Sequence, residues 1–226
     1  MPLALGFLTC TGIAAIAALA RHEARAAAEA RHSILDPALS VLDTGKISIE
    51  PSDFPKIEGT HRGRAYRVTL IPDTLTFRRL PQLWFDVTLK RDLPSVCGSV
   101  GILVRPSGAD YYSLTDRLRD QIPIPADFPE ACLIKGQGAA SRRTLELIAP
   151  DVAALLRDPK IKEVVVCPRG VRIVRQLSQG SRGQHLILRQ SVFENARLEA
   201  QELKNAIDEI SRIESAVLDL DLVTAA

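Results

Sequence analysis

Five arginines close together form the main chemical feature of the sequence. They lie within residues 169–189, a stretch that contains no acidic residue and includes His185. Guanidinium groups present a planar fork of donors that suits phosphate groups, and an anionic leaflet attracts basic residues near its surface. The pattern therefore predicts contact with an anionic surface such as lipid headgroups. The residues are Arg169, Arg172, Arg175, Arg182 and Arg189.

An acidic segment near the end of the chain offers these arginines an alternative partner. Residues 191–226 hold eight acids against three basic residues, so their net charge is −5, while the whole chain carries +2. Charges on solvated faces commonly pair within one fold. A protein partner is a further alternative. Nucleic acid is disfavoured, because no aromatic residues interleave with the arginines and no RNA-binding motif occurs.

Other residues with chemical potential lack the spacing that a reactive site needs. Residues 136–141 (Gly-Gln-Gly-Ala-Ala-Ser) resemble a dinucleotide loop, but a serine replaces the third glycine and no acid ends the next predicted strand. Four cysteines show no CxxC spacing and no zinc-type pairing with histidine. We therefore expect no catalytic residue, no cofactor and no metal, and the chain is predicted not to be an enzyme.

The first segment has the length and composition of a membrane anchor. Residues 2–20 carry no charge, and a helix of that length spans roughly 28 Å, close to the hydrocarbon core of a bilayer. Arg21, Arg25 and Arg31 all follow the apolar run, which places the body in the cytoplasm. The prediction is a single-pass inner-membrane protein. A cleaved signal peptide, giving a secreted or periplasmic body, and a buried helix are the alternatives.

The remaining elements must form the domain that this segment carries. Period-two runs separated by turn residues predict strands at 57–60, 65–71, 83–89, 100–104, 132–135, 161–167, 171–177 and 185–189. Helices are expected at 112–121, at 142–157 and, as one long amphipathic helix, from Phe193 to Leu220. The fold class is α+β, with a mostly antiparallel sheet. The predicted organisation is an anchor and juxtamembrane helix at 1–35, a linker at 36–55 and the cytoplasmic domain at 56–226.

Several short stretches resemble uncharacterised bacterial single-span membrane proteins. They are residues 73–75, 79–84, 105–108, 162–164 and 168–172. The resemblance covers most of the body and implies a membrane-tethered domain. It implies no activity, so no catalytic or binding residue is transferred from it.

Together these features predict a membrane-tethered, non-enzymatic interaction or regulatory domain that meets a protein partner. The alternative is a tethered domain that binds an anionic small ligand or a lipid headgroup, and an enzyme is the third hypothesis. A ligand-binding domain needs a pocket of several hundred Å³ with convergent arginines. An interaction module instead needs an exposed apolar patch.

Overall fold

The computed structural model describes residues 17–19, 21–74, 80–94, 97–181, 193 and 195–224 of the 226-residue chain. Its centre is a nine-stranded sheet in the order β1-β2-β3-β4-β9-β8-β5-β7-β6, and each pairing between the described strands is antiparallel. The strands are β1 (Thr44–Ile49), β2 (Pro55–His61), β3 (Arg64–Asp73), β4 (Gln82–Lys90), β5 (Ser99–Val104), β6 (Asp120–Gln121), β7 (Cys132–Gln137), β8 (Ile161–Cys167) and β9 (Gly170–Gln179).

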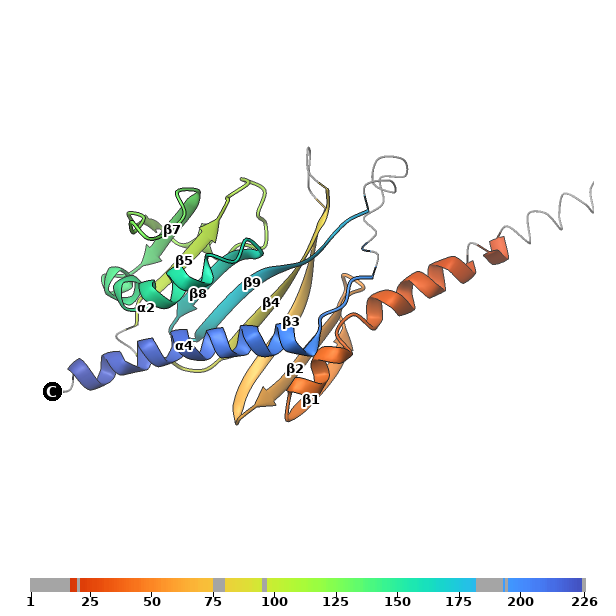
Figure 1. Ribbon diagram of the computed structural model, residues 1–226, viewed down its shortest axis with the longest axis horizontal. Helices are drawn as coiled ribbons and strands as arrows, with labels where there is room; N and C mark the ends of the chain where they lie inside the picture. The colour runs from red at the N-terminus through yellow and green to blue at the C-terminus, as the bar shows by residue number, and fades with distance from the viewer. Residues whose placement is uncertain are drawn as a thin grey trace, which may run out of the picture.

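Two α-helices cover one face of this sheet. They are α2 (Ser141–Leu155) and the long α4 (Ala200–Thr224), which lie over the same side of the strands in Figure 1. The short 3-10 helix η1 (Pro37–Val41) packs beside α4, and a second one, η2 (Thr115–Arg117), lies between β5 and β6. The α+β class, the antiparallel sheet and the long C-terminal helix are therefore confirmed.

The main core lies between the sheet and these helices. Side chains alternate across a strand, and every second residue of β4 enters this core with 1% exposure or less: Leu83, Phe85, Val87 and Leu89. Val164 and Val166 of β8 and Val171 and Ile173 of β9 join the same cluster. The helices contribute residues such as Ile148, Leu203 and Ile207. The residues between them on each strand consequently face the other side of the sheet.

Part of that second face is covered by the roof segment, which we define as residues 107–118. Tyr112 packs against Trp84, with 6.1 Å between ring centroids, and these two form a small core with Val174. Close packing at Gly101 brings the segment against β5, because a Cβ there would lie 2.5 Å from Thr115 Oγ1. The predicted helix at 112–121 is wrong in extent, since only η2 is helical there.

The predicted linker at 36–55 belongs to the folded body. Leu35 and Ala38 are fully buried, and β1 pairs with β2 along its whole length. The long helix starts at Ala200 rather than Phe193. Phe193 instead packs edge-to-face on Phe54, with ring centroids 6.4 Å apart. The predicted strand at 185–189 lies outside the described residues.

Residues 21–32 form a helix that points away from the sheet (Figure 1). An ion pair and a hydrogen bond fix its end to the turn before β2, because Asp53 accepts from Arg31 at 2.5 Å and from His32 Nε2 at 2.9 Å. Among the described residues, no helix combines the length and the apolar character needed to cross a bilayer. Most of the predicted anchor, residues 2–16 and 20, lies outside the described residues.

Candidate functional site

A cavity of about 740 Å³ lies on the sheet face opposite α2 and α4, beside the roof segment. We call it the basin. Strands β3, β4, β9 and β8 form its floor and walls, and the turns after β4 and β8 form one end. It is lined by Arg67, Thr69, Asp86, Thr88, Lys90, Arg91, Asp92, Leu114, Val165, Cys167, Arg169, Gly170, Val171 and Arg172. Its volume lies within the ordinary range of small-molecule sites.

The strand register explains why the surface is hollow here. Arg67, Thr88, Arg172 and Val165 are direct cross-strand neighbours, so their side chains form one row across four strands. In the next row Lys90 and Cys167 flank Gly170, which has no side chain. Gly170 has φ +138°, and a Cβ there would lie 1.9 Å from the carbonyl oxygen of Leu89. The position therefore requires glycine, and no side chain projects from the floor there.

Arg172 is the central charged group of the floor, and it is only 8% exposed. Its Nε donates to Asp86 Oδ2 at 2.5 Å, and its Nη1 donates to Glu163 Oε2. Thr88 Oγ1 donates to the other oxygen of Asp86 at 2.7 Å. Two carboxylates thus hold one buried guanidinium in place, which is the arrangement that a buried charge requires.

Glu163 connects this floor to the roof segment. It is fully buried, and its Oε1 accepts from Ser113 Oγ at 2.6 Å, from Thr115 N at 2.9 Å and from Thr115 Oγ1 at 2.8 Å. Its other oxygen, Oε2, accepts from Arg172, so both oxygens of the carboxylate accept hydrogen bonds. The roof and one wall of the basin are therefore held by a single buried acid.

A second buried acid, Asp110, fixes the start of the roof. It binds Lys162 Nζ at 3.1 Å and accepts from Ser107 N at 2.7 Å. Burial of the carboxyl opposes ionisation, but these two groups outweigh it and hold the pKa of Asp110 below its usual range. Burial, and then the charge of Asp110, raise the pKa of neighbouring Tyr112, whose hydroxyl stays protonated.

The rim of the basin carries cations that are accessible. Within the described residues, the exposed side chains of Arg67 and Arg169 form no ion pair. Lys90 binds Glu58 at 3.0 Å on the surface, and this hydrogen bond lowers the pKa of Glu58. Arg91 reaches across to Glu214 of α4 at 2.5 Å. The acids that line the basin are Asp86, which is bound to Arg172, and the exposed Asp92.

The five arginines predicted from the sequence do not share one surface. Arg169 is exposed at the end of the basin, whereas Arg172 is buried in its floor. Arg175 is buried on the opposite face of the sheet, 6% exposed, where it binds Glu209 at 2.9 Å and Asp158 at 3.3 Å. Arg172 and Arg175 are therefore corrected to internal ion-pair residues. Arg182 and Arg189 lie outside the described residues.

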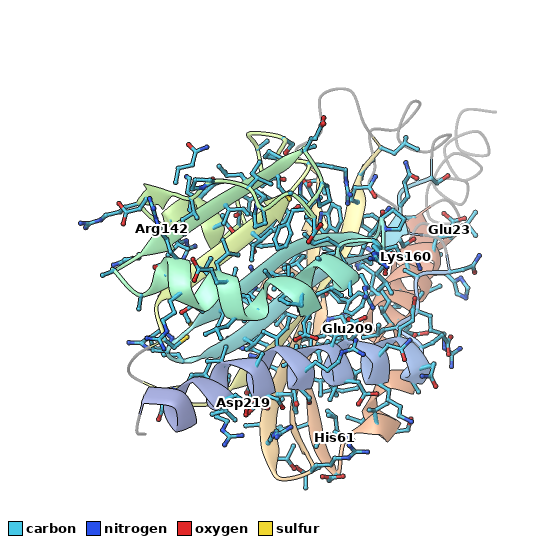
Figure 2. All side chains as sticks on the ribbon, turned by 60° about the vertical axis from the view of Figure 1, so that its left-hand side comes forward. Glu23, His61, Arg142, Lys160, Glu209 and Asp219 are labelled. Carbon is cyan, nitrogen blue, oxygen red and sulfur yellow. The ribbon has the colours of Figure 1, made fainter. Side chains whose placement is uncertain are left out.

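The alternative of pairing with the acidic C-terminal helix is correct for several basic residues. Glu209 lies on the side of α4 that faces the sheet (Figure 2) and binds Arg175. Burial raises the pKa of Glu209, and the charge of Arg175 opposes this rise. The fully buried Glu214 binds Arg64 at 3.2 Å and Arg91 at 2.5 Å. The opposite net charges of body and helix are thus partly explained by internal contacts.

Two other arrangements were candidates for a site. A cavity of about 910 Å³ lies between residues 27–36, Phe54 and residues 193–197, but its arginines are already paired: Arg31 with Asp53 and Arg197 with Glu199. Among the residues that the structure describes, no group of three His, Cys, Asp or Glu side chains could hold a metal ion. Of these two cavities, the basin is the one with accessible cations that form no ion pair among the described residues.

Several basin residues were missed by the sequence analysis. Arg67 and Lys90 lie outside the arginine-rich stretch 169–189 that the sequence analysis singled out. The signal that would have found them is cross-strand register, which places Arg67 beside Thr88 and Lys90 beside Gly170. No protein-family model matches the chain, and no curated protein matches its sequence.

Proposed function

We propose that this chain is a membrane-tethered domain that binds an anionic small ligand or a lipid headgroup in the basin. The observation that supports this most directly is the cavity of about 740 Å³ whose rim carries Arg67, Lys90, Arg91 and Arg169. A concave site with a few convergent polar groups is the usual form of a ligand site. Its cations define the ligand as an anion, and arginine suits phosphate or carboxylate.

The contacts of each cation suggest its role. Among the described residues, Arg67 and Arg169 form no ion pair, so neither has to break one to bind a ligand, although Arg67 lies opposite Glu58 in the β2–β3 register. Lys90 gives up little if it leaves Glu58, because exposed ion pairs are weak and screened. Arg172 and Arg91 are held by buried carboxylates. We assign these last two to shaping the site and its potential rather than to direct contact.

The location of the basin also fits an accessible binding site. It lies on the face that α2 and α4 leave open, and the roof segment covers only the neighbouring part of that face. The four large apolar side chains that are exposed in the described chain come from four separate segments: Leu19, Ile49, Tyr111 and Ile124. Because the basin offers more specific chemistry than these residues, we place ligand binding ahead of the protein-partner hypothesis.

The test is binding of simple anions to the full-length chain in detergent. Isothermal titration calorimetry with inorganic phosphate and pyrophosphate gives affinities directly. Trp84, the only tryptophan, lies on the basin's face of the sheet and gives a fluorescence signal. Flotation with phosphatidylcholine vesicles, with and without phosphatidic acid, distinguishes a lipid headgroup from a free anion.

Variants decide whether binding occurs in the basin. Replacing both Arg67 and Arg169 with Ala should weaken binding about tenfold or more, because each removes a charge-assisted contact. The matched control replaces Arg142 and Arg143 with Ala, which removes the same charge from the exposed start of α2 (Figure 2). Equal losses in both variants, or no saturable binding of any of these probes, would overturn the proposal.

A further inference from the structure

We infer that the ligand of the basin is an amphipathic organic anion, in which an anionic group is joined to an apolar body. This inference rests on the proposed function, and it narrows the ligand class. Inorganic phosphate and other fully polar anions would be weak ligands, since they would make no apolar contacts with the apolar part of the cavity lining. The basis is the unequal distribution of charged and apolar side chains along the cavity.

The cationic and apolar ends of the basin lie on different strands. The row Arg67, Thr88, Arg172, Val165 crosses β3, β4, β9 and β8 in register. Neighbouring strands are about 4.8 Å apart, so the first and last positions of this row are separated by roughly 14 Å. A ligand that contacts both ends therefore extends over more than the size of one phosphate group.

The far end has an apolar surface. Val165 is buried, and it lines the cavity together with the half-buried Leu114 of the roof segment. Cys167 extends this surface by one row, and its thiol behaves as a small hydrophobe. Because Gly170 contributes no side chain between Lys90 and Cys167, a planar body can lie low against the floor there.

The middle of the row offers no free cation to an anionic group, because its one arginine is already bound. Arg172 binds Asp86 and Glu163, so the centre of the floor does not require a ligand charge of its own. Thr88 donates to Asp86 and presents a neutral surface between the ends. The anionic group is thus directed to the accessible cations Arg67, Lys90 and Arg169, and the apolar body to Val165 and Leu114.

The experiment compares three probes on the full-length chain by isothermal titration calorimetry: inorganic phosphate, 1-naphthyl phosphate and uncharged 1-naphthol. We expect 1-naphthyl phosphate to bind at least about tenfold more tightly than either other probe, because it buries apolar surface and also fills the cationic end. Phosphate and 1-naphthyl phosphate binding with equal affinity would overturn this inference while the proposed function stands. Neither phosphate compound binding, or 1-naphthol binding as tightly as its phosphate, would overturn both.

Two variants test the contributions of the two ends of the cavity to binding. Leu114→Ala combined with Val165→Thr, whose size is nearly conserved, should reduce the preference for 1-naphthyl phosphate over inorganic phosphate severalfold. Arg67→Ala should lower the affinities for inorganic phosphate and for 1-naphthyl phosphate by similar factors. Leu114→Ala alone, at a half-buried position, repeats the test if the double variant does not fold. A preference that survives the loss of these apolar side chains would contradict the inference.

Discussion

Glu163 provides the sharpest test of how the floor of the basin is held. The side chain is fully buried and accepts hydrogen bonds from Arg172, Ser113 and Thr115. Glu163→Gln keeps the size and leaves one oxygen for the donors of the roof segment. The new amide nitrogen, however, faces the Arg172 guanidinium, where two donors oppose each other. The variant therefore removes the charge-assisted bond selectively.

The expected loss of stability depends on the hydrogen bonds that Arg172 keeps in the variant. Since Asp86 still binds its Nε, the guanidinium is not left as an unpaired buried charge. The loss is then that of one hydrogen bond to a charged group, about 2–3 kcal/mol in the free energy of unfolding. Glu163→Ala also leaves the donors of Ser113 and Thr115 without an acceptor, so its cost rises to about 3–5 kcal/mol.

Urea unfolding followed by circular dichroism measures these differences, with the single tryptophan as a second probe. The control is Glu146→Gln, which makes the same chemical change on the exposed surface of α2 and should stay within about 0.5 kcal/mol. Hydrogen exchange in residues 107–118 should accelerate in both Glu163 variants. A Glu163→Gln variant as stable as the control, with unchanged exchange in the roof segment, would refute the assigned role.

Three further predictions test other parts of the fold. Because the pKa of Asp110 is lower in the folded chain, its stabilising effect is present above the ordinary pKa of an aspartate and is lost as the pH falls through the lowered pKa. Asp110→Asn should flatten the pH dependence of the free energy of unfolding in that acidic range, and an unchanged slope would contradict this. Gly170→Ala should lower the free energy of unfolding by about 3 kcal/mol or more, because the new Cβ meets the Leu89 carbonyl. Gly63 also has a positive φ, but a Cβ there would meet open space, so Gly63→Ala should lower the free energy of unfolding by only about 1–2 kcal/mol. Equal losses in the two variants would disprove the role of the contact with Leu89. The full-length protein should remain with the membrane after alkaline carbonate washing, whereas a soluble mature form starting near Arg21 would exclude the predicted anchor.

The sequence predicted best the elements with a strong pattern of apolar residues. The hairpin of β8 and β9 has two segments rich in valine and isoleucine around a Pro-Arg-Gly turn, and β4 alternates around Trp84. The heptad-like spacing of apolar residues likewise identified α4. In these elements local propensity and burial agree, which is the situation in which pattern analysis is reliable.

Residues 36–55 and 107–118 were misassigned because their structure depends on distant partners. β1 contains Thr44, Gly45 and Lys46, and its pattern is typical of a loop until β2 pairs with it. The roof segment is ordered by the buried carboxylates of Asp110 and Glu163. A long-range hydrogen bond to one acid leaves no periodicity in the sequence, so neither segment could be assigned from pattern alone.

The arginine cluster shows how strand period could have improved the analysis. Arg172 and Arg175 lie three residues apart on β9, and residues on a strand alternate between faces. Once β9 is taken as a strand, an odd spacing places the two guanidinium groups on opposite sides of the sheet. One side meets the acids of α4 and the other meets Asp86 and Glu163. A cationic surface on this sheet therefore had to be sought across neighbouring strands, where Arg67 of β3 and Lys90 of β4 border the basin together with Arg169 of the turn before β9.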